Sequence, residues 1–195
     1  CNGPLLKQII IFAVPLMLSG ILQLLFNAAD IVVVGRFSGS DSLAAVGATS
    51  SLINLLVNLF IGISVGANVL FGRFCGAQDE KNASETVHTA ICIAIYGGIL
   101  MIFVGILLAR PMLELMGTPE NVISLSTIYM RIYFLGMPGF MIYNFGAALL
   151  RAVGDTRRPL YFLTVAGIIN VIGNLILVVG FNLGVAGVAN STTVS

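Results

Sequence analysis

The carboxylate of Asp30 lies deep within a long apolar stretch of this sequence. An ionised aspartate at the centre of a bilayer costs on the order of 2.5 to 3.5 kcal/mol, so such a residue usually faces a cavity, a partner or an ion. Four residues precede it at helical spacing and share its face: Pro15, Ser19, Gln23 and Asn27. The pattern predicts a helix with a polar stripe that ends in an acid.

Two further stretches carry small or polar residues at helical spacing. They are Asn54, Asn58, Gly62 and Gly66 in one stretch, and Gly167, Asn170 and Asn174 in the other. Three helices with such faces could line one polar cavity. The alternative is that the amides tie helices together by hydrogen bonds of about 0.6 to 2 kcal/mol, and we favour it for Asn54 and Asn58. For Asp30 we favour a functional role, because a single acid without a counter-charge is poorly suited to stabilise contacts between helices.

Prolines and tyrosines inside the apolar stretches suggest further roles. Pro15 and Pro138 each remove a backbone hydrogen bond, which permits a bend and exposes a carbonyl. Tyr143 could offer aromatic surface to an organic substrate, whereas packing or interfacial anchoring better explains Tyr129 and Tyr133. The sequence has no HExxH, GxSxG or phosphate-binding glycine-lysine loop, so we expect no enzyme.

The composition defines the environment of these residues. Of the 195 residues, 58% are hydrophobic and 9% are charged, and the mean hydropathy is +1.05, whereas a soluble domain has roughly 25% charged residues. Apolar runs of about twenty residues can cross a ~30 Å hydrocarbon layer. A net charge of +1 and scattered basic residues argue against nucleic acid as a partner. The chain is therefore expected to be an all-α, polytopic bundle in contact with membrane lipid.

The apolar runs predict five complete membrane spans and the start of a sixth. The spans cover about Ile9–Val34, Leu43–Phe74, Glu85–Ala109, Val122–Leu150 and Leu160–Phe181, and the sixth begins at about Val185. Polar loops are expected between them at Gly35–Ser42, Cys75–Ser84, Arg110–Asn121 and Arg151–Pro159. Gly136, Pro138 and Gly139 interrupt the fourth span. Because the sixth helix stops short of crossing a bilayer, we expect the chain to be a fragment of a longer protein.

The loop charges predict the orientation. Most basic residues of the loops fall on one side of the predicted spans: Lys7, Arg73, Lys81, Arg151, Arg157 and Arg158. Only Arg36 and Arg110 fall on the other. By the positive-inside rule the N-terminus is cytoplasmic and the protein crosses the cytoplasmic membrane several times.

Three segments together closely resemble the multidrug and toxic compound extrusion (MATE) transporters. They are NAADIVVVGRFSGSDSLAAVG around Asp30, RAVGDTRRP after the fourth span, and INVIGNLILVVGFNLGVAGVANSTTVS at the end. The resemblance implies the N-terminal lobe of a two-lobe, twelve-helix transporter whose C-terminal lobe is missing here. It also implies that a Na⁺ or H⁺ gradient drives the efflux of cationic or amphipathic small molecules, with no cofactor beyond the coupling ion.

The resemblance also implies roles for individual residues. Asp30 matches the essential acid of the first helix, and Pro15 matches the proline at which that helix bends in some members. Asn170 matches the asparagine of a fifth-helix NxxxD pattern, and Thr192 matches a sixth-helix threonine. The acid of that pattern is Asn174 here, which puts a two-carboxylate Na⁺ site or proton sharing in doubt.

The expected ion and substrate site thus rests on one carboxylate and several neutral groups. A site with one carboxylate and neutral oxygens is chemically reasonable for a hard cation such as Na⁺. Its expected members are Asp30, Asn170, Asn174, Thr192, Gln23, Asn27 and Tyr143, with Pro15 as a hinge.

Two other functions stay open. A flippase for lipid-linked precursors shares the architecture, but it should need cationic residues in its cavity to bind a pyrophosphate. A non-transporting membrane subunit would not call for an acid aligned with polar residues on one helical face.

The orientation can be tested by cysteine labelling of intact cells. Cysteines placed in Gly35–Ser42 or Arg110–Asn121 should react with an impermeant maleimide added outside, and those in Cys75–Ser84 or Arg151–Pro159 should be spared. The opposite labelling pattern would overturn the predicted orientation.

Overall fold

The computed structural model describes residues 5–37, 39–180 and 184–194. These residues form a succession of helices without a strand among them: α1 (Leu5–Phe37), α2 (Gly39–Gly76), α3 (Glu80–Leu115), α4 (Glu120–Leu135), α5 (Met137–Ala152), α6 (Arg157–Asn174), the π-helix η1 (Leu175–Gly180) and α7 (Gly184–Val194). The expected all-α class is confirmed.

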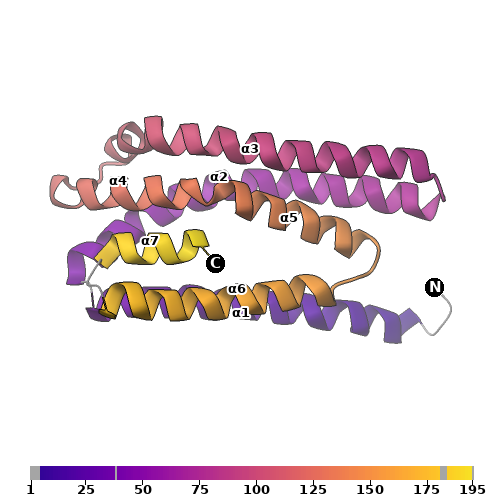
Figure 1. Cartoon of the computed structure of the whole chain (residues 1–195), viewed down its shortest axis with the longest axis horizontal. Helices are drawn as coiled ribbons and strands as arrows, with labels where there is room; N and C mark the ends of the chain where they lie inside the picture. The colour runs from indigo at the N-terminus through magenta and orange to yellow at the C-terminus, as the bar shows by residue number, and fades with distance from the viewer. Residues whose placement is uncertain (1–4, 38, 181–183, 195) are drawn as a thin grey trace.

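The helices lie along the long axis of one elongated bundle (Figure 1). α2 and α3 pack together on one side, and α1 and α6 pack together on the other. α4, α5 and α7 lie between these pairs, with α7 in contact with both α4 and α6. α7 therefore joins the two sides of the bundle.

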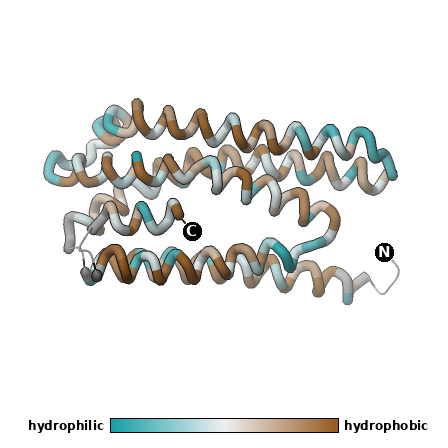
Figure 2. The backbone as a smooth tube through the Cα atoms, viewed as in Figure 1, coloured by the Kyte–Doolittle hydropathy of each residue, from teal (hydrophilic) through white to brown (hydrophobic). Residues whose placement is uncertain are grey.

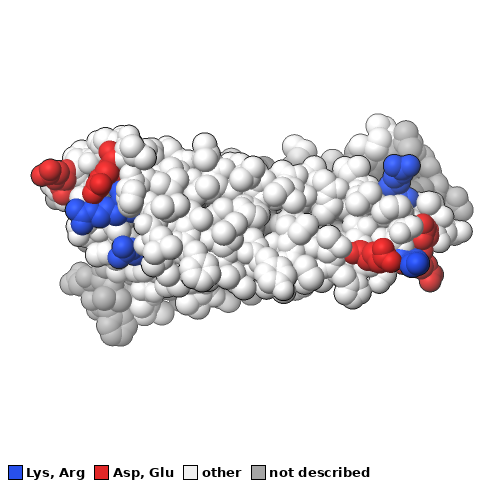
Figure 3. Space-filling model, turned by 90° about the horizontal axis from the view of Figure 1, so that it is seen from above, with Lys and Arg blue, Asp and Glu red and all other residues white. Residues whose placement is uncertain are grey.

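Apolar residues cover the middle of the bundle and polar residues concentrate towards its ends (Figure 2). On the face shown in Figure 3, the charged side chains gather at the two ends and leave the centre free of charge. Exposed large apolar side chains are numerous along α1, α2, α3 and α6. This distribution is that of a helix bundle whose outer surface meets lipid.

The predicted spans are present as long apolar helices. Within the described residues, four segments are long and apolar enough to cross a membrane alone: Ile9–Arg36, Ser42–Gly76, Glu80–Leu115 and Arg157–Val178. α4 and α5 pass the same test together, with a bend of 49° between them. The break falls at Gly136, as the sequence predicted, because Pro138 has no N–H to continue the helical ladder and begins α5 within its first turn.

The helices extend further into the expected loops than the sequence analysis allowed. α1 reaches Phe37 and α2 begins at Gly39, so the loop expected over Gly35–Ser42 is wrong for its described residues. Ser38 lies outside the described residues. The α2–α3 connection shortens from Cys75–Ser84 to residues 77–79.

Local hydrogen bonds explain these extensions. Asp79 caps α3, because its Oδ1 accepts from the Asn82 backbone N–H at 3.2 Å and its Oδ2 accepts from Asn82 Nδ2 at 2.6 Å. α3 also runs on through Pro111 to Leu115, where an Arg110–Glu114 ion pair of 2.8 Å joins successive turns. Polar residues beyond the hydrocarbon layer thus continue a helix instead of ending it.

A close approach of α3 to α5 depends on Gly98. A Cβ built at this position would lie 2.5 Å from Cα of Pro138, so only glycine lets the two backbones meet at the α4–α5 break. A Cβ at Gly146 of α5 would meet no atom within 4 Å.

Gly98→Ala and Gly146→Ala should change stability in opposite directions. Overpacking costs about 1–3 kcal/mol at Gly98, whereas alanine at the open position gains up to ~1 kcal/mol of helix propensity. Thermal unfolding of both variants in the same detergent measures the difference. Equal midpoints would contradict the α3–α5 contact.

Candidate functional site

Four of the predicted site residues meet where α1, α6 and α7 converge. Asn174 Nδ2 on α6 donates to Asp30 Oδ1 on α1 at 2.5 Å and is 3.1 Å from Asn170 Oδ1 on its own helix. Asn170 Nδ2 donates in turn to Thr192 Oγ1 on α7 at 3.3 Å. The polar cluster formed by Asp30, Asn174, Asn170 and Thr192 is a continuous hydrogen-bonded chain across three helices.

The approach of α1 to α6 sets the position of Asp30. The two helices run side by side in the same direction (Figure 1), and the ring of Phe26 fills the space that a side chain at Gly167 would occupy. Phe26 lies one helical turn before Asp30, and Gly167 lies two turns before Asn174. The same packing that seats Phe26 therefore brings the carboxylate to the amide.

Burial differs within the cluster and decides which groups face outward. Asn174 is 1% exposed and Asn170 is 6% exposed, whereas Asp30 and Thr192 are half-buried. The carboxylate thus lies at the edge of a buried amide pair. An ion or a charged ligand could reach the Asp30 carboxylate from its exposed side, while Asn174 donates a hydrogen bond to the same carboxylate from the buried side.

The amide of Asn174 is used in an unbalanced way. Its nitrogen donates to both Asp30 and Asn170, whereas its Oδ1 is buried and accepts no hydrogen bond from the described residues. A buried acceptor without a partner normally costs about 1–3 kcal/mol. This buried oxygen without a donor, on the residue that contacts the Asp30 carboxylate, is suited to bind a cation.

Ser191 also belongs to this site, although no motif or spacing in the sequence points to it. It is 3% exposed, and its Oγ donates to the backbone carbonyl of Asn170 at 2.7 Å. Thr192 Oγ1 is 2.9 Å from the carbonyl of Val188 on its own helix. Only its place directly before Thr192 in the sequence could have suggested Ser191.

The tyrosines of α4 are close to the cluster. Tyr129 is buried, and its ring centroid lies 6.1 Å from that of Tyr133. Both phenols lie within electrostatic range of the Asp30 carboxylate. The two tyrosines therefore pack against each other, and they do so near Asp30.

A π-helix follows the cluster directly. α6 ends at Asn174, and the chain continues as η1 over Leu175–Gly180. π-helical turns have i→i+5 hydrogen bonds and are frequent at functional sites. No residue pattern predicts this change, since the apolar run continues through it.

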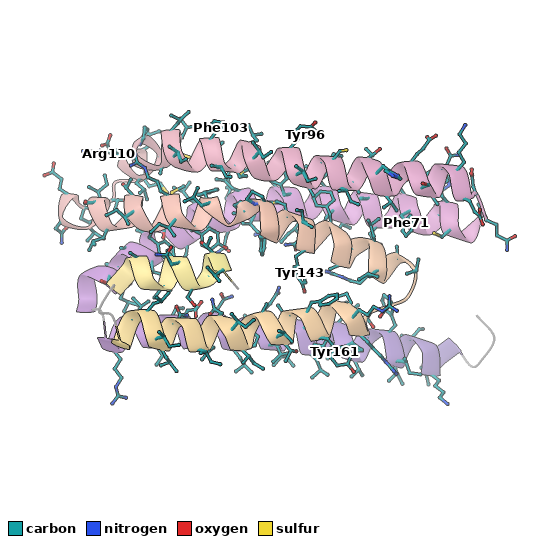
Figure 4. All side chains as sticks on the ribbon, viewed as in Figure 1. Phe71, Tyr96, Phe103, Arg110, Tyr143 and Tyr161 are labelled. Atoms are coloured by element: carbon teal, nitrogen blue, oxygen red, sulfur yellow. The ribbon has the colours of Figure 1, made fainter. Side chains whose placement is uncertain are left out.

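Other predicted site residues are not brought to the cluster. Gln23 and Asn27 of α1 are exposed on the surface of the bundle. Tyr143 lies between α5 and α6 (Figure 4), where its hydroxyl donates to the carbonyl of Pro159 at 3.2 Å, near the start of α6. That contact ties the helices together at the end of the bundle predicted to be cytoplasmic.

Of the amides of α2, Asn68 ties that helix to α5, because its Nδ2 donates to the Ala148 carbonyl at 2.5 Å, whereas Asn54 and Asn58 do not reach another described helix. Asn54 and Asn58 are exposed, and Asn58 Nδ2 donates to the Asn54 carbonyl at 2.7 Å within α2. The interhelical role favoured for this pair is therefore wrong for the described part of the chain.

The oxygens of the cluster fit a hard monovalent cation better than a transition metal. The described residues contain no group of three or more His, Cys, Asp or Glu side chains that could hold a metal. The cluster offers the Asp30 carboxylate, two amide oxygens and a hydroxyl, which are oxygen ligands of the kind that hard cations prefer.

A family model and two curated proteins match most or all of this chain. The family model MatE matches residues 15–176. The probable multidrug resistance protein YoeA of Bacillus subtilis is 35% identical over 193 residues, covering 97% of this chain and 42% of YoeA. The probable multidrug resistance protein YpnP of the same organism is 29% identical over 194 residues, covering all of this chain and 44% of YpnP.

A solved structure shares the same fold. It shows the outward-facing conformation of a multidrug resistance MATE family transporter of the MOP superfamily, and it matches with a TM-score of 0.90 at 25% identity. The match covers 96% of this chain and 42% of that one. The chain spans less than half the length of the relatives it matches.

Asn174→Asp, made in the intact protein that contains this chain, should make its stability depend more strongly on Na⁺. A second carboxylate beside Asp30 adds a like-charge repulsion that a bound cation relieves. Replacing choline chloride by NaCl at constant ionic strength should raise the unfolding midpoint, by roughly 2–4 °C for each kcal/mol of binding energy.

Asn190→Asp is the matched control. Asn190 is also on α7, but it is exposed and its Nδ2 donates to its own helix at Ala186. The same Na⁺ response in both variants would show that the cluster is not a cation site.

Proposed function

Because this chain belongs to the MatE family, we propose that the protein containing it exports cationic or amphipathic organic compounds across the cytoplasmic membrane in exchange for Na⁺ or H⁺. The observation that carries this proposal is the half-buried Asp30 carboxylate, held by a chain of neutral amides and a hydroxyl. Among the described residues it is the one acid within the apolar part of the spans. The site therefore has one negative charge to offer.

Exchange follows from competition for that charge. A cationic substrate and a coupling cation cannot both neutralise one carboxylate, so binding of one favours release of the other. Each ligand shifts the balance between inward-open and outward-open states only by its differential affinity for them. The coupling ion and the substrate must accordingly favour different states.

The Asn174 amide offers a way to sense which ligand is bound. When Asp30 is ionised and alone, the amide nitrogen faces it as a donor. Rotation of the amide by 180° would turn Oδ1 towards a cation between the two side chains, or towards a proton on Asp30. Rotation would give Oδ1 a partner but would end the two hydrogen bonds that Nδ2 now donates, so it is favoured only when a cation or a proton is bound at Asp30.

Pro15 is the proposed hinge that responds to this change. It lies inside α1, which is continuous from Leu5 to Phe37, and its missing N–H removes one rung of the helical ladder. The bond lost is the one to the carbonyl of Ile11, in the turn before Pro15, and the Ser19 Oγ that donates to the Pro15 carbonyl at 2.8 Å lies in the turn after it. Bending at this point would move the half of α1 that carries Asp30 relative to its first turns.

A second half of the protein is needed for this cycle. Alternating access in transporters of this kind is largely the rocking of one repeat against another. The chain spans 42% of YoeA, and Gln23 and Asn27 present amides on an exposed face of α1. These residues could meet substrate in a cavity that the missing C-terminal lobe completes.

The alternatives are less well supported. A flippase for lipid-linked pyrophosphates would need cationic groups in its cavity, whereas the charged group of the cluster is an acid. A non-transporting subunit gives no reason for a charge held by hydrogen bonds across three helices. Transport of a labelled lipid-linked pyrophosphate by the intact protein would favour the flippase.

Asp30→Asn in the intact protein should abolish ion-coupled export while leaving the fold in place. The substitution keeps the size and hydrogen-bonding capacity of the side chain but removes the charge, so insertion should be unchanged or improved. Dye efflux from proteoliposomes under an imposed Na⁺ or H⁺ gradient measures the effect.

Glu120→Gln serves as the control, because Glu120 is exposed in the first turn of α4 and belongs to neither the cluster nor its helices. We expect efflux close to wild type for this variant. Efflux by Asp30→Asn at the wild-type rate and equal protein level would end the single-acid mechanism.

A further inference from the structure

A groove between α2 and α3 lies apart from the polar cluster. Its volume is about 380 Å³, and it opens on the outer surface at the end of the bundle that carries the α2–α3 connection. Ile63 and Leu70 of α2 and Ile93 of α3 form apolar walls, each with more than a third of its surface exposed. Gly66 leaves the groove open, because a Cβ there would meet no atom within 4 Å.

The length of this groove matches one leaflet of a bilayer. At ~1.5 Å per residue, the wall from Ile63 to Phe74 is about 16 Å long, close to half of a ~30 Å hydrocarbon layer. Its end near Phe74 adjoins the loop at residues 77–79, on the side predicted to be cytoplasmic. An apolar groove of this length and volume suits an acyl chain of the inner leaflet.

The mouth of the groove is acidic. Glu85 lines it and is exposed, and its carboxylate makes no hydrogen bond or ion pair with any residue that the structure describes. The neighbouring hydroxyls are already used, because Thr86 Oγ1 donates to the Asn82 carbonyl and Thr89 Oγ1 donates to the Glu85 carbonyl. Among the described residues that line the groove, Glu85 is the charged one.

An adjoining cavity adds to the negative charge. It has a volume of about 530 Å³, shares Phe74 with the groove, and is lined by Asp79 and Glu80. Two hydrogen bonds from Asn82 lower the pKa of Asp79, so that carboxylate is ionised at neutral pH. Arg73 and Lys81 lie at the same end of the bundle, but among the described residues no lysine or arginine lines either cavity. The charged groups that line the mouth itself are acidic and favour the ammonium of a head group.

We propose that this groove binds an aminophospholipid of the inner leaflet, with one acyl chain along α2 and the ammonium group at Glu85. The apolar walls bury the chain, and the carboxylate accepts hydrogen bonds from the primary ammonium. An anionic lipid such as phosphatidylglycerol meets repulsion at the same place. The site depends on neither Asp30 nor the proposed transport cycle.

Native mass spectrometry of the intact protein, loaded from detergent micelles with either phosphatidylethanolamine or phosphatidylglycerol, tests this site. Wild type should retain phosphatidylethanolamine preferentially. Glu85→Gln should lower that preference about two- to fivefold, the range of an exposed charge pair. Gly66→Leu should remove the bound lipid by filling the groove, whereas Gly47→Leu, at another open position of α2, should not.

Thermal unfolding in lipid-free detergent checks that each variant is folded. Equal retention of the two lipids by wild type would overturn the proposal. Unchanged preference in Glu85→Gln and Gly66→Leu would also overturn it, because the preference would then arise elsewhere on the intact protein. Glu85-dependent binding of tetraphenylphosphonium without any preference for phosphatidylethanolamine would replace the lipid by an amphipathic cation.

Discussion

The charge on Asp30 constrains the arrangement of the helices around it, since an ionised group within a membrane must receive hydrogen bonds or a counter-charge. Asn174 supplies one such bond, and this contact requires α6 to lie against α1. Asn174 and Asn170 share a further bond, and Asn170 reaches Thr192 on α7. The packing of three helices therefore follows in part from how one carboxylate is held.

Neutral partners give this carboxylate its proposed use. An arginine or lysine beside Asp30 would neutralise it permanently in an ion pair, whereas amides and a hydroxyl stabilise the charge without cancelling it. The cluster keeps a net charge of about one unit that a small cation, a proton or a cationic compound could neutralise in turn. The π-helix that follows Asn174 adds backbone irregularity at the same depth.

The exposed polar face of α1 and α2 fits a chain that is part of a longer protein. Gln23 and Asn27 on α1 and Asn54 on α2 are exposed, and amides facing hydrocarbon are costly unless they find partners. The chain covers 42% of YoeA and 44% of YpnP. A second lobe or a water-filled cavity would satisfy these groups, as the proposed transport cycle requires.

The sequence alone determined the environment, the class and much of the order of the elements. Apolar runs of membrane-spanning length exclude a soluble fold, and Gly136 with Pro138 predicts the break between α4 and α5 because proline cannot continue the backbone ladder. The spacing of Asn170 and Asn174 places both amides on one face of α6. These inferences depend only on neighbours within a few turns.

The tertiary structure decided which of those faces meet. Asp30 and Asn174 are 144 residues apart, and helical periodicity says that each has a polar face without saying that the two faces touch. The same limit explains why Gln23 and Asn27, on the predicted stripe, are exposed, and why Ser191 was missed. Periodicity fixes the direction in which a side chain points around its own helix axis. A site also depends on how helices are rotated and shifted relative to one another. Close contacts such as that of Phe26 with Gly167 set this rotation and shift only in the folded bundle.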